Sequence, residues 1–210
     1  MAQNEASIAE LIHDYLRTRA HRDSVRFSPF PLGGQDRHFL SDSLLGRVDH
    51  FCLIEMKFGE AQLQSEAKKR RRVEALCRAL EREPEMRALH DQCHFIAWMD
   101  KTKHVRASAY RDRICNKEVL GSSCGLTQNV PDLGSTVSLN SFADGFLGHP
   151  PTKCLSKEDF KRYINWLHNV VTGTPIIRLD LYGRAVDGNG EVVAFPLTSI
   201  DEVHGWFLRQ

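Results

Sequence analysis

Residues 38–58 read HFLSDSLLGRVDHFCLIEMKF, and this stretch decides the fold. It predicts two strands, at 38–45 and 50–58, with a turn between them at 46–49. In the second strand Glu55 and Lys57 are two residues apart, so both side chains leave the same face of the sheet. The strand is otherwise mostly apolar, so two charges on one face indicate that this face opens into a cleft.

Asp42 and Asp49 are the acids that compete to join Glu55 around a divalent cation. A hairpin centred between residues 47 and 48 pairs Asp42 with Leu53 and places it diagonal to Glu55, about 7 Å away between Cβ atoms. Asp49 precedes Glu55 by six residues on the same strand, which is roughly 20 Å of extended chain. We therefore predict that Asp42 and Glu55 share the cation through their carboxylate oxygens.

Helical and strand periodicity around this stretch predicts the order α-β-β-β-α-β for the first hundred residues. The expected helices lie at 5–20, 60–82 and 85–92, and the further strands at 25–28, 94–99 and 105–110. Pro84 ends the long helix. We expect these elements to form a core domain over residues 1–115.

The remaining residues, 116–210, are expected to form a loop-rich linker followed by an extension. Gly, Ser, Asn and Pro are frequent up to residue 153, which is typical of loops. Ser156, with Asp159 near it, begins a capping box for a helix that runs to about Val171. A hairpin at 176–182 and 191–196, with its turn at 187–190, and a short helix at 199–208 complete the chain.

The motif Ser41-Asp42, twelve residues, Glu55-Met56-Lys57 and then a helix resembles the PD-(D/E)xK nuclease superfamily, with serine in place of the leading proline. The resemblance covers about residues 1–100. It implies a restriction-endonuclease-like αβββαβ core, with a mixed central sheet flanked by helices and a C-terminal α+β extension beyond it.

The same resemblance implies the roles of the site residues. Asp42 and Glu55 would hold Mg²⁺ or Mn²⁺, and Lys57 would orient or activate the attacking water. More loosely, Glu5 in the first helix is implied as a further metal ligand, and Gln64 in the helix after the motif as a contact to the site. By itself, Glu-x-Lys on a strand is often only an ion pair on a solvated face.

The run Lys68-Lys69-Arg70-Arg71-Arg72 stands out in a chain whose net charge is only +1. A local basic patch can bind a phosphate backbone even when the whole chain is nearly neutral. We expect Lys68, Lys69, Arg71 and Arg72 to contact nucleic acid, DNA in the first place with RNA left open. A solvated helix face is the alternative for the run alone.

These features predict a Mg²⁺-dependent deoxyribonuclease in a prokaryotic defence, mobile-element or repair setting, directed by a partner protein or by homodimer formation. One alternative is a catalytically silent nuclease-fold subunit that binds or scaffolds a larger complex. Another is an interaction protein stabilised by zinc bound to Cys115, Cys124, Cys154 and a histidine such as His149, although these spacings match no zinc ribbon or finger.

The six cysteines are widely spaced, without a C-x-x-C pair, and we expect buried thiols rather than disulfides. The first twenty residues carry Glu5, Glu10 and Asp14 and do not read as a signal peptide. No apolar run approaches the roughly 20 residues that span a bilayer. We therefore expect a cytoplasmic protein that does not associate with membranes.

Overall fold

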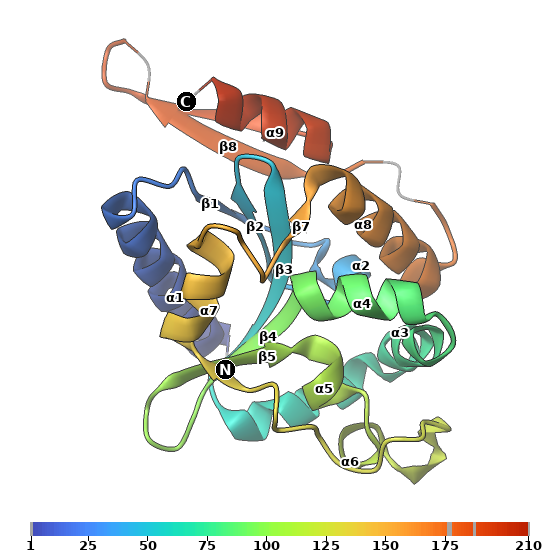
Figure 1. Ribbon diagram of the computed structural model, residues 1–210. Helices are drawn as coiled ribbons and strands as arrows, with labels where there is room; N and C mark the ends of the chain where they lie inside the picture. Colours follow the sequence, from blue (N-terminus) through green and yellow to red (C-terminus); the bar gives the residue numbers. More distant parts are fainter. Residues whose placement is uncertain (1, 176–177, 187, 210) are drawn as a thin grey trace.

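The computed structural model describes the backbone of residues 2–175, 178–186 and 188–209. Side chains at 2–5, 36–37 and 185–186 lie outside the described part. Within that part, a mixed central sheet has helices on both faces (Figure 1). The α/β class with a mixed sheet flanked by helices, which the sequence analysis predicts, is confirmed.

Seven of the described strands form the sheet, in the order β1-β2-β3-β4-β5-β6, with β7 paired to β3. Their bounds are Ser28–Pro31 (β1), Ser43–Arg47 (β2), His50–Lys57 (β3), His94–Met99 (β4), Val105–Ala109 (β5), Val137–Ser138 (β6) and Leu155–Ser156 (β7). β3 and β4 run parallel, and the other paired strands run antiparallel. β3 lies inside the sheet, and every residue of it after His50 is buried. The charged side chains of β3 therefore sit within the protein, and the expectation that their face opens into a cleft is wrong: Glu55 is fully buried and Lys57 is 5% exposed, because η1 (Glu60–Lys69) covers that face.

Helices cover the two faces of the sheet unequally (Figure 1). α1 (Ala2–Arg22) and α7 (Leu139–Leu147) pack on one face, and α1 buries Ile8, Ile12 and Leu16 at helical spacing. α4 (Pro84–Cys93) and α8 (Lys157–Thr172) pack on the other face, with α3 (Arg70–Arg82) against them. Ser156 caps α8 by accepting a hydrogen bond from the Asp159 amide, as its sequence predicts.

The residues after 116 divide between this core and a separate hairpin. β6, α7, β7 and α8 join the main layers, so only part of the expected extension lies outside them. β8 (Leu181–Val186) and β9 (Val192–Leu197) form their own two-stranded sheet, packed with α9 (Ile200–Leu208) beside β1 and α8 (Figure 1). The short elements are α2 (Asp36–Phe39), α5 (Tyr110–Ile114), α6 (Lys117–Leu120) and η2 (Ser122–Cys124).

The β2–β3 hairpin differs from the predicted one in register. β2 runs to Arg47, which pairs with His50, so the turn is Val48-Asp49 and not 46–49. Gly46 is therefore a strand residue. A Cβ there would come within 2.9 Å of the Phe207 ring, so close packing and not turn geometry requires this glycine. The predicted strand at 38–45 is correspondingly shortened, since α2 occupies its first residues.

The expectation that every cysteine is a buried thiol is wrong for one pair. Cys77 on α3 and Cys115 after α5 form a disulfide, 38 residues apart in the chain. The other described cysteines, Cys52, Cys93, Cys124 and Cys154, are buried thiols. Spacing alone did not reveal the pair because α3 and α5 come together only through the tertiary fold.

Candidate active site

The β2–β3 register brings Asp42 level with Glu55. The pairing runs from Arg47 with His50 to Ser43 with Ile54, so Asp42 lies one residue beyond the last pair, beside the segment from Ile54 to Met56 and not opposite Leu53 as predicted. The Asp42 amide donates to the Ile54 carbonyl at 3.0 Å, and Asp42 Oδ2 accepts from the Met56 amide at 2.6 Å. The shift is two residues, an even number, so both carboxylates keep the face that the sequence predicts.

Glu55 belongs to a buried cluster of two carboxylates and two ammonium groups. Lys57 Nζ lies 2.5 Å from Glu55 Oε1 and 2.9 Å from Glu66 Oε1. Lys69 Nζ lies 2.8 Å from Glu55 Oε1 and 3.3 Å from Glu66 Oε1. The hydroxyl of Tyr110 donates to Glu66 Oε2 at 2.6 Å. Each carboxylate in the cluster is therefore balanced by a nearby cation.

A 3₁₀ helix positions the second carboxylate and the second ammonium. The segment predicted as the start of a long α-helix is η1 (Glu60–Lys69), which precedes α3. A 3₁₀ helix has three residues per turn, so Leu63, Glu66 and Lys69 lie on one side of it. Leu63 and Glu66 are buried against the core, and Lys69 follows them into the cluster.

Gln64 does not join the cluster. It is exposed on η1 and lines a separate pocket with Glu60, Leu63 and Arg113. One residue beyond Leu63 corresponds to a third of a turn in a 3₁₀ helix, which directs Gln64 away from Glu55. Glu66 is the member of the cluster that the sequence analysis missed. Its spacing of three from Leu63 and from Lys69 was the available signal.

The electrostatics of the cluster set the charge on each group. Burial, and then the charge of Glu55, raise the pKa of Asp42 to about 7. Burial also acts to raise the pKa of Glu55, but the ammonium groups of Lys69 and Lys57 outweigh it and hold that pKa below its ordinary value. Burial opposes the charge on Lys57, yet Glu55 and Glu66 raise its pKa above the ordinary value. At neutral pH, Glu55 is therefore ionised, Lys57 is charged and Asp42 is near its midpoint.

Two carboxylate oxygens of the acids are left without a hydrogen-bond partner that the described residues supply. Glu55 Oε2 is buried and has no hydrogen-bond partner among the described residues. Asp42 Oδ1 remains as a second oxygen, because Oδ2 takes the Met56 amide. No set of three or more His, Cys, Asp or Glu in the described part has metal-site geometry. Two carboxylates still suit Mg²⁺, which keeps several waters and is often completed by substrate phosphates. The side chain of Glu5, the further ligand implied by the sequence, lies outside the described residues.

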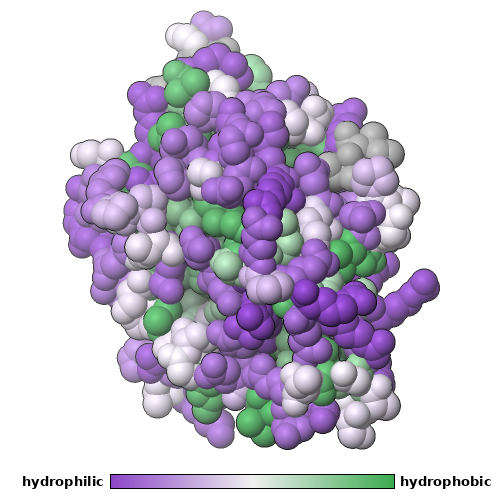
Figure 2. All heavy atoms as spheres, turned by 45° about the vertical axis from the view of Figure 1, so that its right-hand side comes forward, coloured by the Kyte–Doolittle hydropathy of each residue, from purple (hydrophilic) through white to green (hydrophobic). Residues whose placement is uncertain are grey.

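A basic groove begins at this cluster. A cavity of about 680 Å³ lies between the start of α3 and the end of α8. The basic side chains that line it are those of Lys68, Lys69, Arg71, Arg72 and His38. The described residues that line it include no carboxylate, and Lys69 belongs both to the groove and to the cluster. Hydrophilic side chains cover most of the face that turns this side of the molecule forward (Figure 2).

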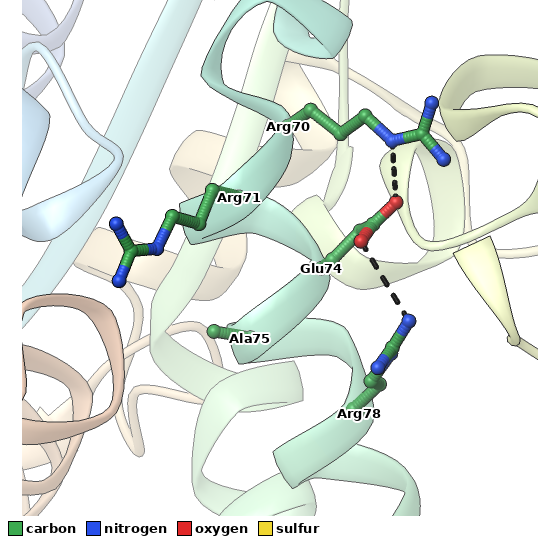
Figure 3. A pocket seen from close by; sticks show the side chains of 5 residues that line it. All are labelled: Arg70, Arg71, Glu74, Ala75 and Arg78. Atoms are coloured by element: carbon green, nitrogen blue, oxygen red, sulfur yellow. Dashed lines mark hydrogen bonds and ion pairs between the residues drawn. The ribbon is translucent and has the colours of Figure 1, made fainter.

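Arg70, the remaining residue of the basic run, lies on the other side of α3. Figure 3 shows Arg70 and Arg71 pointing away from each other across the helix. Arg70 Nε pairs with Glu74 Oε1 at 2.6 Å, and Arg78 Nη2 lies 3.7 Å from Glu74 Oε2. The positive charge of Arg70 is therefore partly neutralised, whereas the groove side of α3 presents cations without a lining acid.

The proposed zinc ligands do not form a site. Cys115 forms a disulfide with Cys77, so its thiolate is not available to a metal.

Asp49, the acid that the sequence analysis rejected as a metal ligand, is exposed at the hairpin turn and pairs with His50 at 2.7 Å. The candidate active site therefore consists of Asp42, Glu55, Lys57, Glu66 and Lys69.

Comparisons with protein-family models, with curated proteins and with solved structures find no match to this chain. None of the helices in the described residues is long and apolar enough to cross a membrane. The functional argument therefore rests on the buried cluster and the basic groove beside it.

Proposed function

We propose that the protein is a metal-dependent nuclease of the PD-(D/E)xK kind, with a restriction-endonuclease-like core, that hydrolyses phosphodiester bonds in DNA. The observation that carries the proposal is the closeness of Asp42 to Glu55, whose buried Oε2 has no hydrogen-bond partner among the described residues and whose Oε1 pairs with Lys57. The element order is α1, β1, α2, β2, β3, η1, α3, α4 and β4; without the short α2, and with η1, α3 and α4 taken as one helical segment, it matches the αβββαβ order of that superfamily and supports the same proposal.

Asp42 and Glu55 would hold Mg²⁺ or Mn²⁺ through Asp42 Oδ1 and Glu55 Oε2. When bound, the cation supplies Lewis acidity that makes a water nucleophilic at neutral pH and offsets charge growing on the phosphate. Lys57 keeps its proton because its pKa is raised, so it serves as a fixed positive charge and not as the base that accepts the proton from water. A fixed charge is most useful next to the oxygens that become negative in the transition state.

The groove supports a polynucleotide as the substrate. A phosphate backbone binds where several cations line one surface, and Lys68, Arg71 and Arg72 face the groove that starts at Lys69. A strand placed there would lead a phosphodiester towards Glu55. We assign the activity to the cytoplasm, in prokaryotic defence, mobile-element movement or repair, with a protein partner or homodimer formation supplying the targeting.

A second function is favoured by the charge balance of the cluster. Lys57 and Lys69 both pair with Glu55, so the buried charges are compensated without a metal. This arrangement suits a nuclease-fold subunit that binds nucleic acid through the groove and does not cleave it. The two proposals differ in whether a divalent cation binds at Glu55.

The test is cleavage of plasmid, linear and single-stranded DNA with Mg²⁺ or Mn²⁺. We expect the wild type to cleave and Lys57→Ala to lose cleavage, while the matched control Lys103→Ala, at an exposed loop position, keeps it. Asp42→Asn serves as the second variant because its side-chain carbonyl can still accept from the Met56 amide, so inactivity there does not reflect unfolding. Equal cleavage by the wild type and Lys57→Ala would refute the nuclease proposal. DNA binding without cleavage in every variant would support the silent subunit.

A further inference from the structure

A chain of buried hydrogen bonds runs behind the carboxylate cluster. His90 Nδ1 and His94 Nδ1 each lie 2.7 Å from the hydroxyl of Tyr163. His94 Nε2 lies 3.2 Å from the Leu40 carbonyl and 3.0 Å from Ser41 Oγ. All five residues are fully buried, so no solvent competes for these bonds. The chain joins α4, α8 and β4 to the segment that leads into β2.

One backbone amide fixes the direction of the whole chain. The Arg111 amide can only donate, and it donates to His90 Nε2 at 3.1 Å. Burial lowers the pKa of His90 well below its ordinary value, so the ring is neutral and carries its single proton on Nδ1. That proton goes to the Tyr163 oxygen, and the Tyr163 hydroxyl therefore donates to His94 Nδ1.

The last ring in the chain must then carry its proton on Nε2. Burial lowers the pKa of His94 to about 4, so this ring is also neutral at physiological pH. Since its Nδ1 accepts from Tyr163, its Nε2–H is the donor to the Leu40 carbonyl and to Ser41 Oγ. The tautomer of His94 is thus determined by an amide on α5, through two intervening side chains.

The donor acts on a strained turn. Leu40 has a φ of 51°, in the left-handed region, and its side chain is fully buried. This conformation is unfavourable for a non-glycine residue, which keeps it only where its surroundings hold it. Asp42 follows two residues later, and its amide joins Ile54 of β3. The Leu40 turn therefore decides where Asp42 enters the sheet.

We propose that His94 is a positioning residue, whose Nε2–H holds the Leu40 turn and thereby keeps Asp42 close to Glu55. Tyr163 and His90 hold His94 in the tautomer that can do so. The consequence for cation binding rests on the proposed function, whereas the hold on the turn does not. None of the three rings touches the substrate in this scheme.

The first test is the ¹⁵N NMR of the imidazole rings in the metal-free wild type. We expect a neutral Nδ1–H form for His90 and a neutral Nε2–H form for His94. The reverse tautomer at His94 would remove the donor to the Leu40 carbonyl and would overturn the proposal.

The second test compares two amide substitutions of different length, His94→Gln and His94→Asn. A Gln amide can place an N–H near the position of Nε2, whereas an Asn amide ends near Nδ1 and cannot reach the Leu40 carbonyl. The readouts are the backbone amide shifts of residues 40–43 and the affinity for Mn²⁺ alone, measured by calorimetry. We expect His94→Asn, and also Tyr163→Phe, to move those amide shifts and to weaken Mn²⁺ binding by about 10–100-fold, the usual effect of losing a residue that orients a metal ligand.

The controls separate this role from a purely structural one. His94→Gln is expected to restore Mn²⁺ binding, and Tyr15→Phe, which loses an exposed bond to Asn140, is expected to leave it unchanged. Wild-type Mn²⁺ affinity and unmoved amide shifts in His94→Asn would refute the proposal, even if its melting temperature falls. If the wild type binds no Mn²⁺ and cleaves no DNA, the nuclease proposal fails, and the amide shifts alone decide whether His94 holds the turn.

Discussion

Replacing Asp42 by Asn is expected to stabilise the metal-free protein, and increasingly so as the pH rises. Burial and the charge of Glu55 raise the pKa of Asp42 from 3.8 to about 7 in the folded protein. The folded state therefore holds this proton more tightly than the unfolded chain does. The resulting stability is fully present below about pH 4 and is lost as the pH rises through about 7. Asn resembles the protonated acid and escapes that loss.

The magnitude follows from the size of the shift. From 3.8 to about 7 is roughly three pH units, and each unit corresponds to about 1.4 kcal/mol. The difference in free energy of unfolding between Asp42→Asn and the wild type should therefore increase in favour of the variant by at most about 4 kcal/mol from pH 4 to pH 8. Mn²⁺ at about 100 times its dissociation constant should raise the free energy of unfolding of the wild type by about 2.7 kcal/mol. It should leave Asp42→Asn unchanged, because the variant lacks the Asp42 carboxylate.

The assay is urea unfolding of both proteins at a series of pH values, because the difference between them cancels the other titrating groups. Asp49→Asn is the matched control, since Asp49 is exposed and pairs with His50. Parallel stability curves for the wild type and Asp42→Asn from pH 4 to pH 8 would refute the argument. They would mean that Asp42 ionises normally and is not held beside a second buried carboxylate.

Three further outcomes test other parts of the structure. Arg71→Ala should weaken DNA binding and reduce the slope of log affinity against log salt concentration by about 0.9, because one phosphate contact is lost. The control Arg22→Ala, on α1, should change neither quantity, and gel-shift titrations at several salt concentrations measure both. Cys77→Ser opens a disulfide that spans 38 residues and should lower the free energy of unfolding by about 3–4 kcal/mol, with no further effect of reductant on the variant. Gly183→Ala puts a Cβ within 2.7 Å of Trp206 Nε1 and should cost about 1–3 kcal/mol in thermal unfolding; an unchanged melting temperature would contradict this packing.

Local patterns predicted the elements whose cause is local. The spacing of Ile8, Leu11, Ile12, Tyr15 and Leu16 predicted α1. Of these, Ile8, Ile12 and Leu16 are buried, whereas Leu11, expected on the same face, is 46% exposed. Ser156 predicted the start of α8 because an N-cap needs only the next three residues. The run from residue 50 predicted β3, since burial on both faces leaves a nearly continuous apolar strand.

Features that depend on distant contacts could not be predicted in this way. Gly46 suggested a turn, but the glycine is required by the Phe207 ring, which packs against it from some 160 residues away. Because Gly46 was placed in the turn and not in β2, the predicted hairpin register was wrong by two residues. Asp42 and Glu55 kept their face because the shift is even. Glu66 was missed because the segment forms a 3₁₀ helix and its partner Tyr110 comes from a later element.

The shared position of Lys69 has a consequence for the order of binding. Its single ammonium group pairs with Glu55 and also lines the groove, so it cannot fully serve a phosphate and a carboxylate at once. An anion that draws Lys69 into the groove leaves Glu55 with less compensating charge and a greater attraction for another cation. By thermodynamic reciprocity, a cation at Glu55 strengthens the hold of the groove on that anion to the same degree. The two ligands would thus arrive cooperatively, with Lys69 as the link between them.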